Sequence, residues 1–212
     1  MPSVGILGAA APVYAFFLVS YGFSPIATDV GYQPEQPVPY SHRIHVGQLG
    51  IDCRYCHNTV EVAAKAAIPP TQTCMNCHTQ VYKESINLTA LFDSYATGMP
   101  VKWKRVHDLP DYAYFNHSAH VNRGVSCVEC HGRVDKMEEI KQEKPLNMGW
   151  CLDCHRKPQG RVRDPLTVTD LGWRFEDDSA AKAQFKTFED YSEFWLKHNN
   201  ISPSQDCSTC HR

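Results

Sequence analysis

The sequence predicts a mainly α-helical protein with extensive loops, and three observations support this fold class. All ten cysteines fall into C-x-x-C-H motifs, the first 28 residues carry no charged side chain, and fourteen prolines and twelve glycines are spread along the 212 residues. Frequent Pro and Gly favour short helices joined by long connections. We therefore expect almost no β-strand. The formal net charge of −2 gives no electrostatic reason to expect a nucleic-acid partner.

The N-terminal segment is apolar and uncharged. Residues 4–22 form a 19-residue apolar stretch, and the first charge is at Asp29. This is about the length that crosses a bilayer as a helix, and Pro12 would kink such a helix without forbidding it. A signal peptide would need a positive start and a small-residue cleavage site, which are not evident, and a core helix would carry more polar positions. We expect residues 1–30 to form a single membrane anchor in contact with lipid, followed by a stiff Pro-rich linker over 31–39.

The five C-x-x-C-H motifs have the signature of c-type haem attachment. Two thiols three residues apart can form thioethers to both vinyl groups of one haem, and the adjacent histidine can reach the iron. Zinc ribbons and redox dithiols also use C-x-x-C, but neither requires the following histidine. We predict five covalent haem c groups. The attachment residues are Cys53 and Cys56, Cys74 and Cys77, Cys127 and Cys130, Cys151 and Cys154, and Cys207 and Cys210. The proximal ligands are His57, His78, His131, His155 and His211.

Two H-x-x-H pairs precede these motifs in matching contexts. His42 and His45 stand seven residues before the first motif, and His117 and His120 stand six residues before the third. Each approach ends in a similar tripeptide, Gly-Ile-Asp or Gly-Val-Ser, and the two copies are offset by about 75 residues. Histidines three apart share one helical turn and can serve two neighbouring irons. The sequence therefore predicts a duplicated di-haem module in which these four histidines are the distal ligands.

The distal ligand of the fifth haem is open between three residues. His198 stands nine residues before Cys207, close to the spacing in the two modules. His107 lies in an aromatic-rich stretch that leads into the second module. Met148 lies three residues before Cys151, where a thioether would raise the potential of its haem or simply fill the core.

The chain is short for the number of haems that it is predicted to carry. From residue 40 onwards, 173 residues serve five haems, which leaves too little chain for an apolar core around each. The porphyrins themselves should form the core, with thioethers cross-linking the chain as disulfides do elsewhere. We divide the chain into the anchor, a first di-haem module (31–100), a second module (101–160) and a fifth-haem segment (161–212).

Helices are expected around each motif and in two further segments. One spans residues 85–97 and ends at Gly98, and the other spans 179–198. The second has an apolar face that we expect to pack on a haem or on a partner subunit, formed by Phe185, Phe188, Tyr191 and Trp195. Acidic residues at Glu138, Glu139, Glu143 and 176–178 are interpreted as solvated surface, or alternatively as a docking patch for a basic redox partner.

The chain resembles the class III multihaem cytochromes and, more closely, the pentahaem (ActA) subunits of bacterial alternative complex III. The resemblance rests on residues 40–61, 103–132 and 146–156 and extends to the N-terminal helix and the fifth motif. It implies an electron-transfer subunit without catalytic activity of its own. Such a subunit takes electrons from an iron–sulfur subunit of a quinol-oxidising complex and passes them to a mono-haem cytochrome c or a copper protein. Haem c is attached outside the cytoplasmic membrane, so we expect an inner-membrane anchor and a periplasmic or outer haem domain.

Two other functions remain open. A multihaem reductase of the nitrite or tetrathionate type needs one open iron, and a short tetrahaem quinol dehydrogenase shares the N-terminal helix but lacks the H-x-x-H duplication. Seven candidate distal ligands for five irons favour closed haems and hence a relay. We expect no small-molecule substrate, and no quinol contact within residues 4–28 because that segment offers no site for quinol protons.

Overall fold

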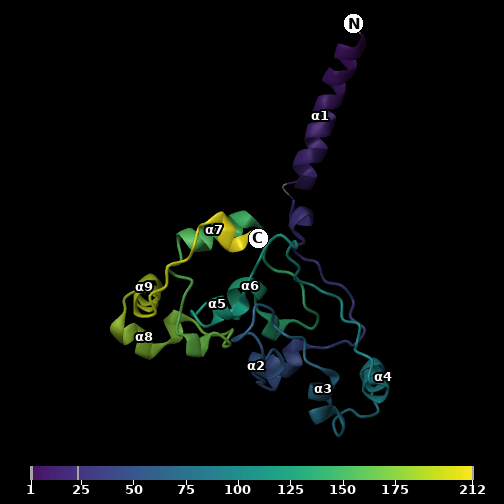
Figure 1. The fold of residues 1–212 in the computed structure, drawn as a ribbon, viewed down its shortest axis with the longest axis vertical. Coiled ribbons are helices and arrows are strands. Elements are labelled where there is room, and N and C mark those ends of the chain that lie inside the picture. The colour runs from purple at the N-terminus through teal and green to yellow at the C-terminus, as the bar shows by residue number, and fades with distance from the viewer. Residues whose placement is uncertain (1, 23, 212) are drawn as a thin grey trace.

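The computed structural model describes residues 2–22 and 24–211, so Met1, Phe23 and Arg212 lie outside it. Within these residues the chain consists of helices and loops, and the only β-structure is two isolated antiparallel bridges, Ala113–His211 and Val125–Val162 (Figure 1). The predicted helical class with almost no strand is confirmed for the described part. Short 3-10 turns connect the helices, among them η4 (Val134–Lys136), η5 (Pro165–Thr167) and η6 (Phe175–Asp177).

Helix α1 (Pro2–Gly22) projects from the rest of the chain and is followed by the turn η1 (Pro25–Thr28). Residues Gly5–Gly22 are long and apolar enough to cross a membrane, and none of this window is buried. A core helix is thereby excluded. An N-terminal signal sequence would have the same length and composition.

The linker after this helix lies against the domain and is not a free spacer. Gly31 N–H donates to the carbonyl of Gln142 (2.8 Å), and Gln142 N–H donates back to Tyr32 (3.0 Å). The buried amide side chain of Gln142 donates to the carbonyl of Thr28 (2.6 Å). Further on, Val38 is buried in a core cluster. The point where the N-terminal helix leaves the domain is therefore fixed.

A helical turn forms at each C-x-x-C-H motif, as expected. These helices are α2 (Cys53–Cys56), α3 (Thr71–His78), α6 (Cys127–His131), α7 (Met148–Arg156) and α10 (Cys207–Cys210). Three begin at a side chain that accepts a hydrogen bond from a backbone N–H of the first turn, which satisfies an otherwise unpaired donor. The capping residues are Asp52 for α2, Ser126 for α6 and Asn147 for α7.

The two H-x-x-H segments have the same local structure. The first leads into the π-helix η2 (Arg43–Gln48) and the second opens α5 (His117–Val121). Both then turn through a glycine with positive φ, +68° at Gly50 and +81° at Gly124, which a residue with a Cβ rarely adopts. Equivalent backbone hydrogen bonds close the turns, from Ile51 to His45 (3.0 Å) and from Val125 to His120 (3.1 Å).

The helix predicted over residues 85–97 is present, but its first turn is a 3-10 turn. It consists of the 3-10 turn η3 (Ile86–Leu88) and α4 (Thr89–Thr97), and it ends as expected at Gly98, whose φ is +73°. Its buried Leu91 packs in a cluster with Val38 and Met75.

The prediction of one helix over residues 179–198 is wrong. The structure has α8 (Ser179–Gln184) and α9 (Phe188–His198). The hydroxyl of Thr187 accepts from the N–H of Asp190 (3.1 Å), and the carboxylate of Asp190 accepts from the N–H of Thr187 (3.2 Å). This capping box starts a new helix, so the chain breaks after Gln184.

The apolar face of this segment packs in part within the chain, and packing of its partly buried rings on a haem or a partner subunit stays a prediction. Tyr191 is buried with Phe175 and Ala181, and the surrounding rings are Trp173, Phe185, Phe188 and Trp195. The helical periodicity identified the face but carried no information about its packing partner.

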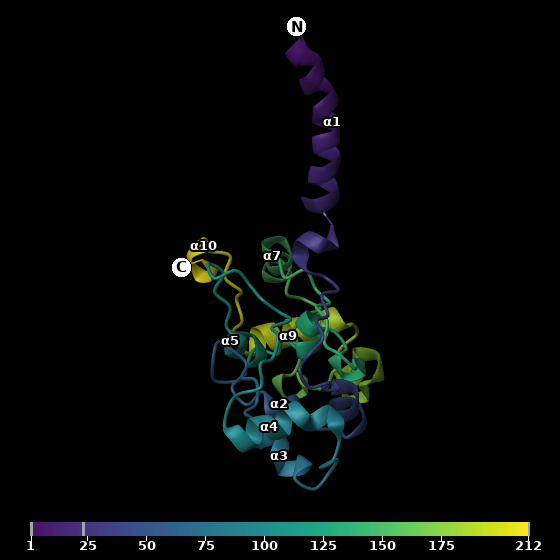
Figure 2. The same ribbon diagram turned by 90° about the vertical axis from the view of Figure 1, so that its right-hand side faces the viewer.

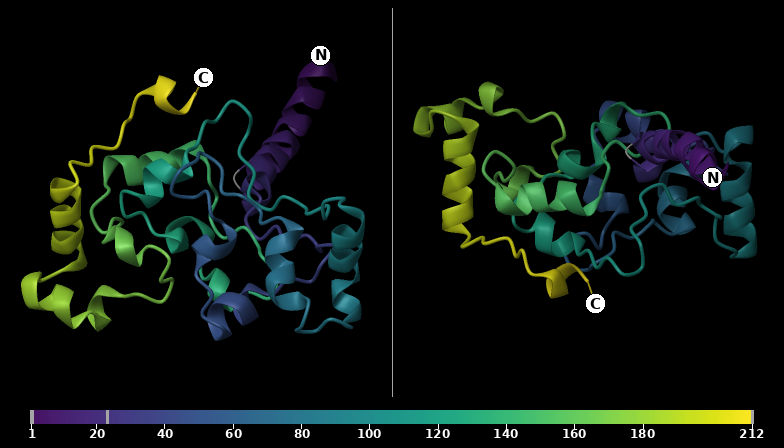
Figure 3. Two further views of the ribbon diagram at one scale, coloured as in Figure 1. Left: turned by 60° about the horizontal axis from the view of Figure 1, so that its bottom comes forward. Right: turned by 90° about the horizontal axis from the view of Figure 1, so that it is seen from above.

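The motif helices spread from one end of the domain to the other. Helices α7 and α10 lie at the end nearest α1, whereas α3 lies at the opposite end (Figures 1 and 2). Figure 3 shows α8 and α9 along one edge of the domain and α3 with α4 along the other edge.

The two positive-φ glycines predict different sensitivities to alanine. At Gly50 a Cβ meets open space, so Gly50→Ala should cost about 1–2 kcal/mol for the left-handed backbone. At Gly124 the same Cβ would collide with the carbonyl oxygen of Arg163, which should add about 1–3 kcal/mol. Denaturant unfolding of the haem-loaded protein measures both. Equal losses for the two variants would contradict this account.

Candidate functional site

Imidazole rings of the H-x-x-H segments face imidazoles of the C-x-x-C-H motifs at one recurring separation. One iron with two axial imidazoles needs ring centres about 6.4 Å apart, because a metal–nitrogen bond is about 2.0 Å and each ring centre lies about 1.2 Å behind its nitrogen. The measured separations are 6.2 Å for His45–His78, 6.4 Å for His117–His131 and 6.1 Å for His120–His155. Each separation is therefore compatible with a single iron between the two rings.

The fourth H-x-x-H histidine faces the remaining motif of the two modules. The pKa of His42 is lowered to about 4, first by burial and then by the neighbouring imidazoles of His57 and His45. Its Nδ1 is buried and finds no hydrogen-bond partner in the described chain. In both modules the first histidine thus lies beside the first motif, and the second histidine lies beside the second motif.

Backbone carbonyls orient seven of these rings in the same way. In each, Nδ1 lies within hydrogen-bond distance of a carbonyl oxygen, which can only accept, so the proton is on Nδ1 and Nε2 is left for a metal. The partners are Ser41 for His45 (2.8 Å), Ala67 for His57 (2.7 Å), Val81 for His78 (3.0 Å), Ala64 for His117 (2.9 Å), Asn116 for His120 (2.7 Å), Ser204 for His155 (2.6 Å) and Tyr112 for His211 (3.2 Å).

An aromatic ring supports each H-x-x-H pair with the same geometry. Tyr40 stacks on His45 at 4.3 Å, and Phe115 stacks on His120 at 4.6 Å. The same rings meet the other histidine edge-on, at 85° for Tyr40–His42 and 87° for Phe115–His117. Sequence reasoning missed this role, although an aromatic residue stands two positions before the first histidine in both copies.

The cysteines place the first three motifs next to one another. The pKa of Cys74 is raised first by burial and then by Cys56, which brings the second motif close to the first. The pKa of Cys53 is raised mainly by a hydrogen bond with the thiol of Cys127. The first motif therefore also touches the third, across 74 residues of sequence.

The fourth motif lies beside the third, and the fifth motif lies beside the fourth. The pKa of Cys130 is raised to about 12, chiefly by burial, with smaller effects from Glu129, Cys154 and Cys151. The pKa of Cys151 is raised by burial and then by Cys210. The motifs thus follow one another in space in the order second, first, third, fourth, fifth. All ten thiols are free of disulfides and available for thioether bonds.

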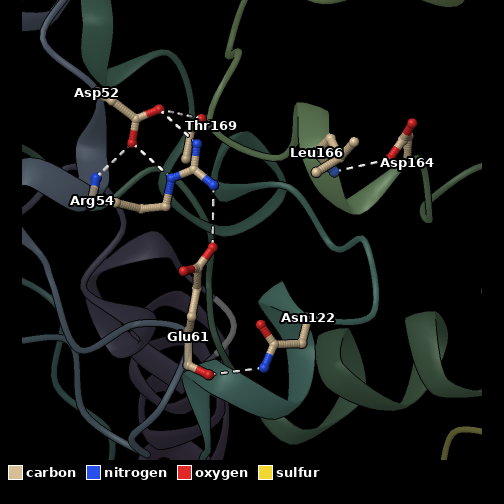
Figure 4. Close-up of polar contacts among 7 residues, drawn as sticks. All are labelled: Asp52, Arg54, Glu61, Asn122, Asp164, Leu166 and Thr169. Carbon is tan, nitrogen blue, oxygen red and sulfur yellow. Dashed lines mark hydrogen bonds and ion pairs between the residues drawn. The ribbon is translucent and has the colours of Figure 1, made fainter.

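A polar network joins the two modules and the C-terminal segment (Figure 4). Arg54 binds the carboxylate of Asp52 (2.9 and 3.0 Å) and reaches Glu61 (3.2 Å). Asp52 also accepts from the hydroxyl of Thr169 (2.8 Å), and Asn122 donates to the carbonyl of Glu61 (2.8 Å). The hydrogen bonds from Arg54 lower the pKa of Asp52 to about 2.

The fifth motif is held by the second module. The backbone N–H of Tyr114 donates to the carbonyl of Cys210 (2.6 Å), and the segment before α10 supplies the Ser204 carbonyl that orients His155. Helix α10 therefore lies beside α7, as Figure 2 shows.

The three candidates for the fifth distal ligand lie in different surroundings. The ring of His107 is 4.4 Å from His131, too close for an iron between them, and its Nε2 is buried without a partner in the described chain. His198 is exposed at the end of α9 and stacks on Phe194 at 5.4 Å. Met148 is 66% exposed at the start of α7, the helix beside α10.

Most of the acidic residues in question form exposed ion pairs with cations of the same chain. The pairs are Glu138 with Arg43, Glu143 with Lys141 (3.1 Å), and Glu176 and Asp177 with Arg174 (3.5 and 3.9 Å). Their exposure agrees with a solvated surface, and docking of a basic partner stays a prediction.

Two comparisons relate the chain to known proteins. Residues 38–91 match the family model of cytochrome c7 and related cytochromes c. The multiheme cytochrome c subunit of menaquinone reductase from Nitratidesulfovibrio vulgaris is 32% identical over 127 residues, which cover 58% of this chain. The chain spans 60% of the length of that relative.

The imidazole pairs predict which histidine variant leaves an iron with a vacant coordination position. His120→Ala removes the ring opposite His155, so one iron per chain should become high-spin and bind carbon monoxide. His198→Ala is the matched control, because this exposed histidine faces none of the five motif histidines in the described chain. EPR and carbon monoxide difference spectra of the haem-loaded protein make the measurement. A fully low-spin His120→Ala protein would overturn the pairing.

Proposed function

We propose that the chain is a multihaem cytochrome c with covalently bound haem c, and that it relays single electrons through five haems in a membrane complex that exchanges electrons with quinones. The observation that carries the proposal is the imidazole pairs spaced for one iron each. Bound haem supplies a reversible one-electron change. An iron with two protein ligands offers no position to a substrate, which favours a relay over a reductase.

The proposed path follows the contacts between motifs. The thiols of Cys53 and Cys127 join the first motif of each module, so the electron path crosses between the modules there. The order second, first, third, fourth, fifth gives the relay two ends, at α3 and at α10.

The end at α10 lies toward the proposed membrane anchor. Gln142 is bonded to Thr28, at the foot of α1, and stands six residues before Met148, the first residue of α7. Six residues span at most about 20 Å, so α7 stays near the point where the anchor leaves the domain. With α1 in the membrane, the fourth and fifth haems face the bilayer side and the second haem lies farthest from it.

Within this function, we propose that the chain is an ActA-type subunit of alternative complex III. The motif order and the N-terminal helix support it, and the similar subunit from N. vulgaris belongs to a menaquinone reductase. Since electrons can pass along a series of haems in either direction, the same haems can serve quinol oxidation or quinone reduction. The haem domain would lie on the periplasmic side, with an iron–sulfur subunit at one end and a mono-haem cytochrome c or a copper protein at the other.

We propose Met148 as the distal ligand of the fifth haem. His107 packs against His131, and His198 is engaged in the aromatic stack of α9. Met148 stands on the helix beside α10, where Cys151 and Cys210 are close enough to interact electrostatically.

The methionine assignment has a matched test. Met148→Leu should leave one iron per chain high-spin and remove the charge-transfer band typical of methionine-bound ferric haem. Met99→Leu, at 65% exposure against 66% for Met148, should change neither. A low-spin Met148→Leu protein would contradict the assignment, and His107→Ala and His198→Ala would then identify the ligand.

The relay itself is tested on the haem-loaded protein in its native membrane complex. We expect only low-spin ferric EPR signals, no carbon monoxide adduct, and five haems per chain by pyridine haemochrome. A stoichiometric high-spin signal that binds carbon monoxide would instead support a reductase with one open iron.

A further inference from the structure

Arg163 is a buried cation beside the third motif. Only 4% of the residue is exposed, and its guanidinium lies 5.0 Å above the ring of Trp173. The Nη2 atom donates to the hydroxyl of Ser126 (2.6 Å) and to the carbonyls of Thr167 (2.7 Å) and Asp170 (2.6 Å). All three acceptors are neutral.

The positive charge of Arg163 has no carboxylate of its own. Within residues 24–211 no Asp or Glu forms an ion pair with it, and its Nε is buried without a partner. Glu129 is paired with Arg161 (3.3 Å), and the carboxylate of Asp170 accepts from the N–H of Gly172 (2.9 Å). Burial lowers the pKa of Arg163 and the nearby carboxylates of Asp170 and Glu129 partly offset this effect, but a guanidinium stays protonated in proteins.

This charge is fixed close to the third haem attachment site. Ser126 caps α6 and directly precedes Cys127, so the guanidinium binds the start of the motif helix. The pKa of Cys127 is lowered mainly by its hydrogen bond with Cys53, and Arg163 lowers it further. The charge therefore lies within electrostatic range of the Cys127 side chain.

The equivalent position in the first module carries the opposite charge. Asp52 caps α2 where Ser126 caps α6, and both follow the positive-φ glycine of their turn. The first haem thus has a carboxylate paired with Arg54 at the start of its motif helix, whereas the third has a buried guanidinium that forms no ion pair in the described chain. The imidazole ligands of the two sites are of the same kind, so this charge is one difference between them, beside the packing of His107 on His131 at 4.4 Å.

We propose that Arg163 raises the reduction potential of the third haem, the central haem of the proposed relay. Reduction of a ferric haem removes one positive charge, so a nearby buried cation favours the ferrous state. The inference rests on the proposed function, because it requires a relay haem at the third motif. Arg163 therefore acts through the reduction potential of the haem and contacts no substrate.

The test is an EPR-monitored redox titration of the haem-loaded, full-length protein. The third haem is identified as the low-spin signal that His117→Ala removes. Arg163→Met deletes the charge and should lower the equilibrium constant for reduction of this haem about tenfold. For one electron, this corresponds to a reduction potential lower by about 59 mV. Arg163→Lys loses the guanidinium geometry but keeps the charge, and should retain most of the potential.

A second variant keeps the proposal testable if Arg163→Met does not fold. Ser126→Asp retains a capping side chain and places a carboxylate beside Arg163, as in the first module, so it should also lower the potential of the third haem. Equal potentials in Arg163→Met and Arg163→Lys, or an unchanged potential in Ser126→Asp, would overturn the proposal. A missing haem by pyridine haemochrome in the wild-type protein would instead overturn the proposed function.

Discussion

The structure depends on one geometric constraint, the distance at which two imidazoles can share an iron. Segments far apart in sequence meet at this separation, as His117 and His131 do at 6.4 Å with their planes only 9° apart. The buried apolar residues form only small, separate clusters, such as the one around Val38, Met75 and Leu91. The imidazole pairs therefore take the place that a continuous hydrophobic core holds in other domains of this size.

The hydrogen bonds that orient the imidazoles also tie the modules together. His117 belongs to the second module, but the carbonyl that orients it comes from Ala64 in the first. In the same way, Ser204 of the C-terminal segment orients His155. The first predicted module thus completes a site in the second, and the C-terminal segment completes another site there, so the predicted modules are not structurally independent. A chain built in this way would keep the proposed haems at fixed separations, which electron transfer between them requires.

The local features could be predicted from the sequence because they depend on residues close together in the chain. The motif turns, the helix end at Gly98 and the spacing of each H-x-x-H pair belong to this class. The break at Thr187 followed from a capping signal that helical periodicity alone overlooked. The packing of the linker on Gln142, the position of His107 and the order of the motifs could not be predicted, because each depends on contacts across many residues, as between Cys53 and Cys127.

The predicted duplication would also constrain how the haems differ. When two sites share the same kind of axial ligands and the same supporting ring geometry, ligand identity cannot separate their potentials, and burial and nearby charge remain as the available causes. The helix cap before each motif is one position where the two copies differ in charge, from Asp52 to Ser126 with Arg163. A substitution at this position leaves the iron ligands in place and changes only the field around them. The duplicated module can therefore acquire a graded series of potentials without a change in its coordination chemistry.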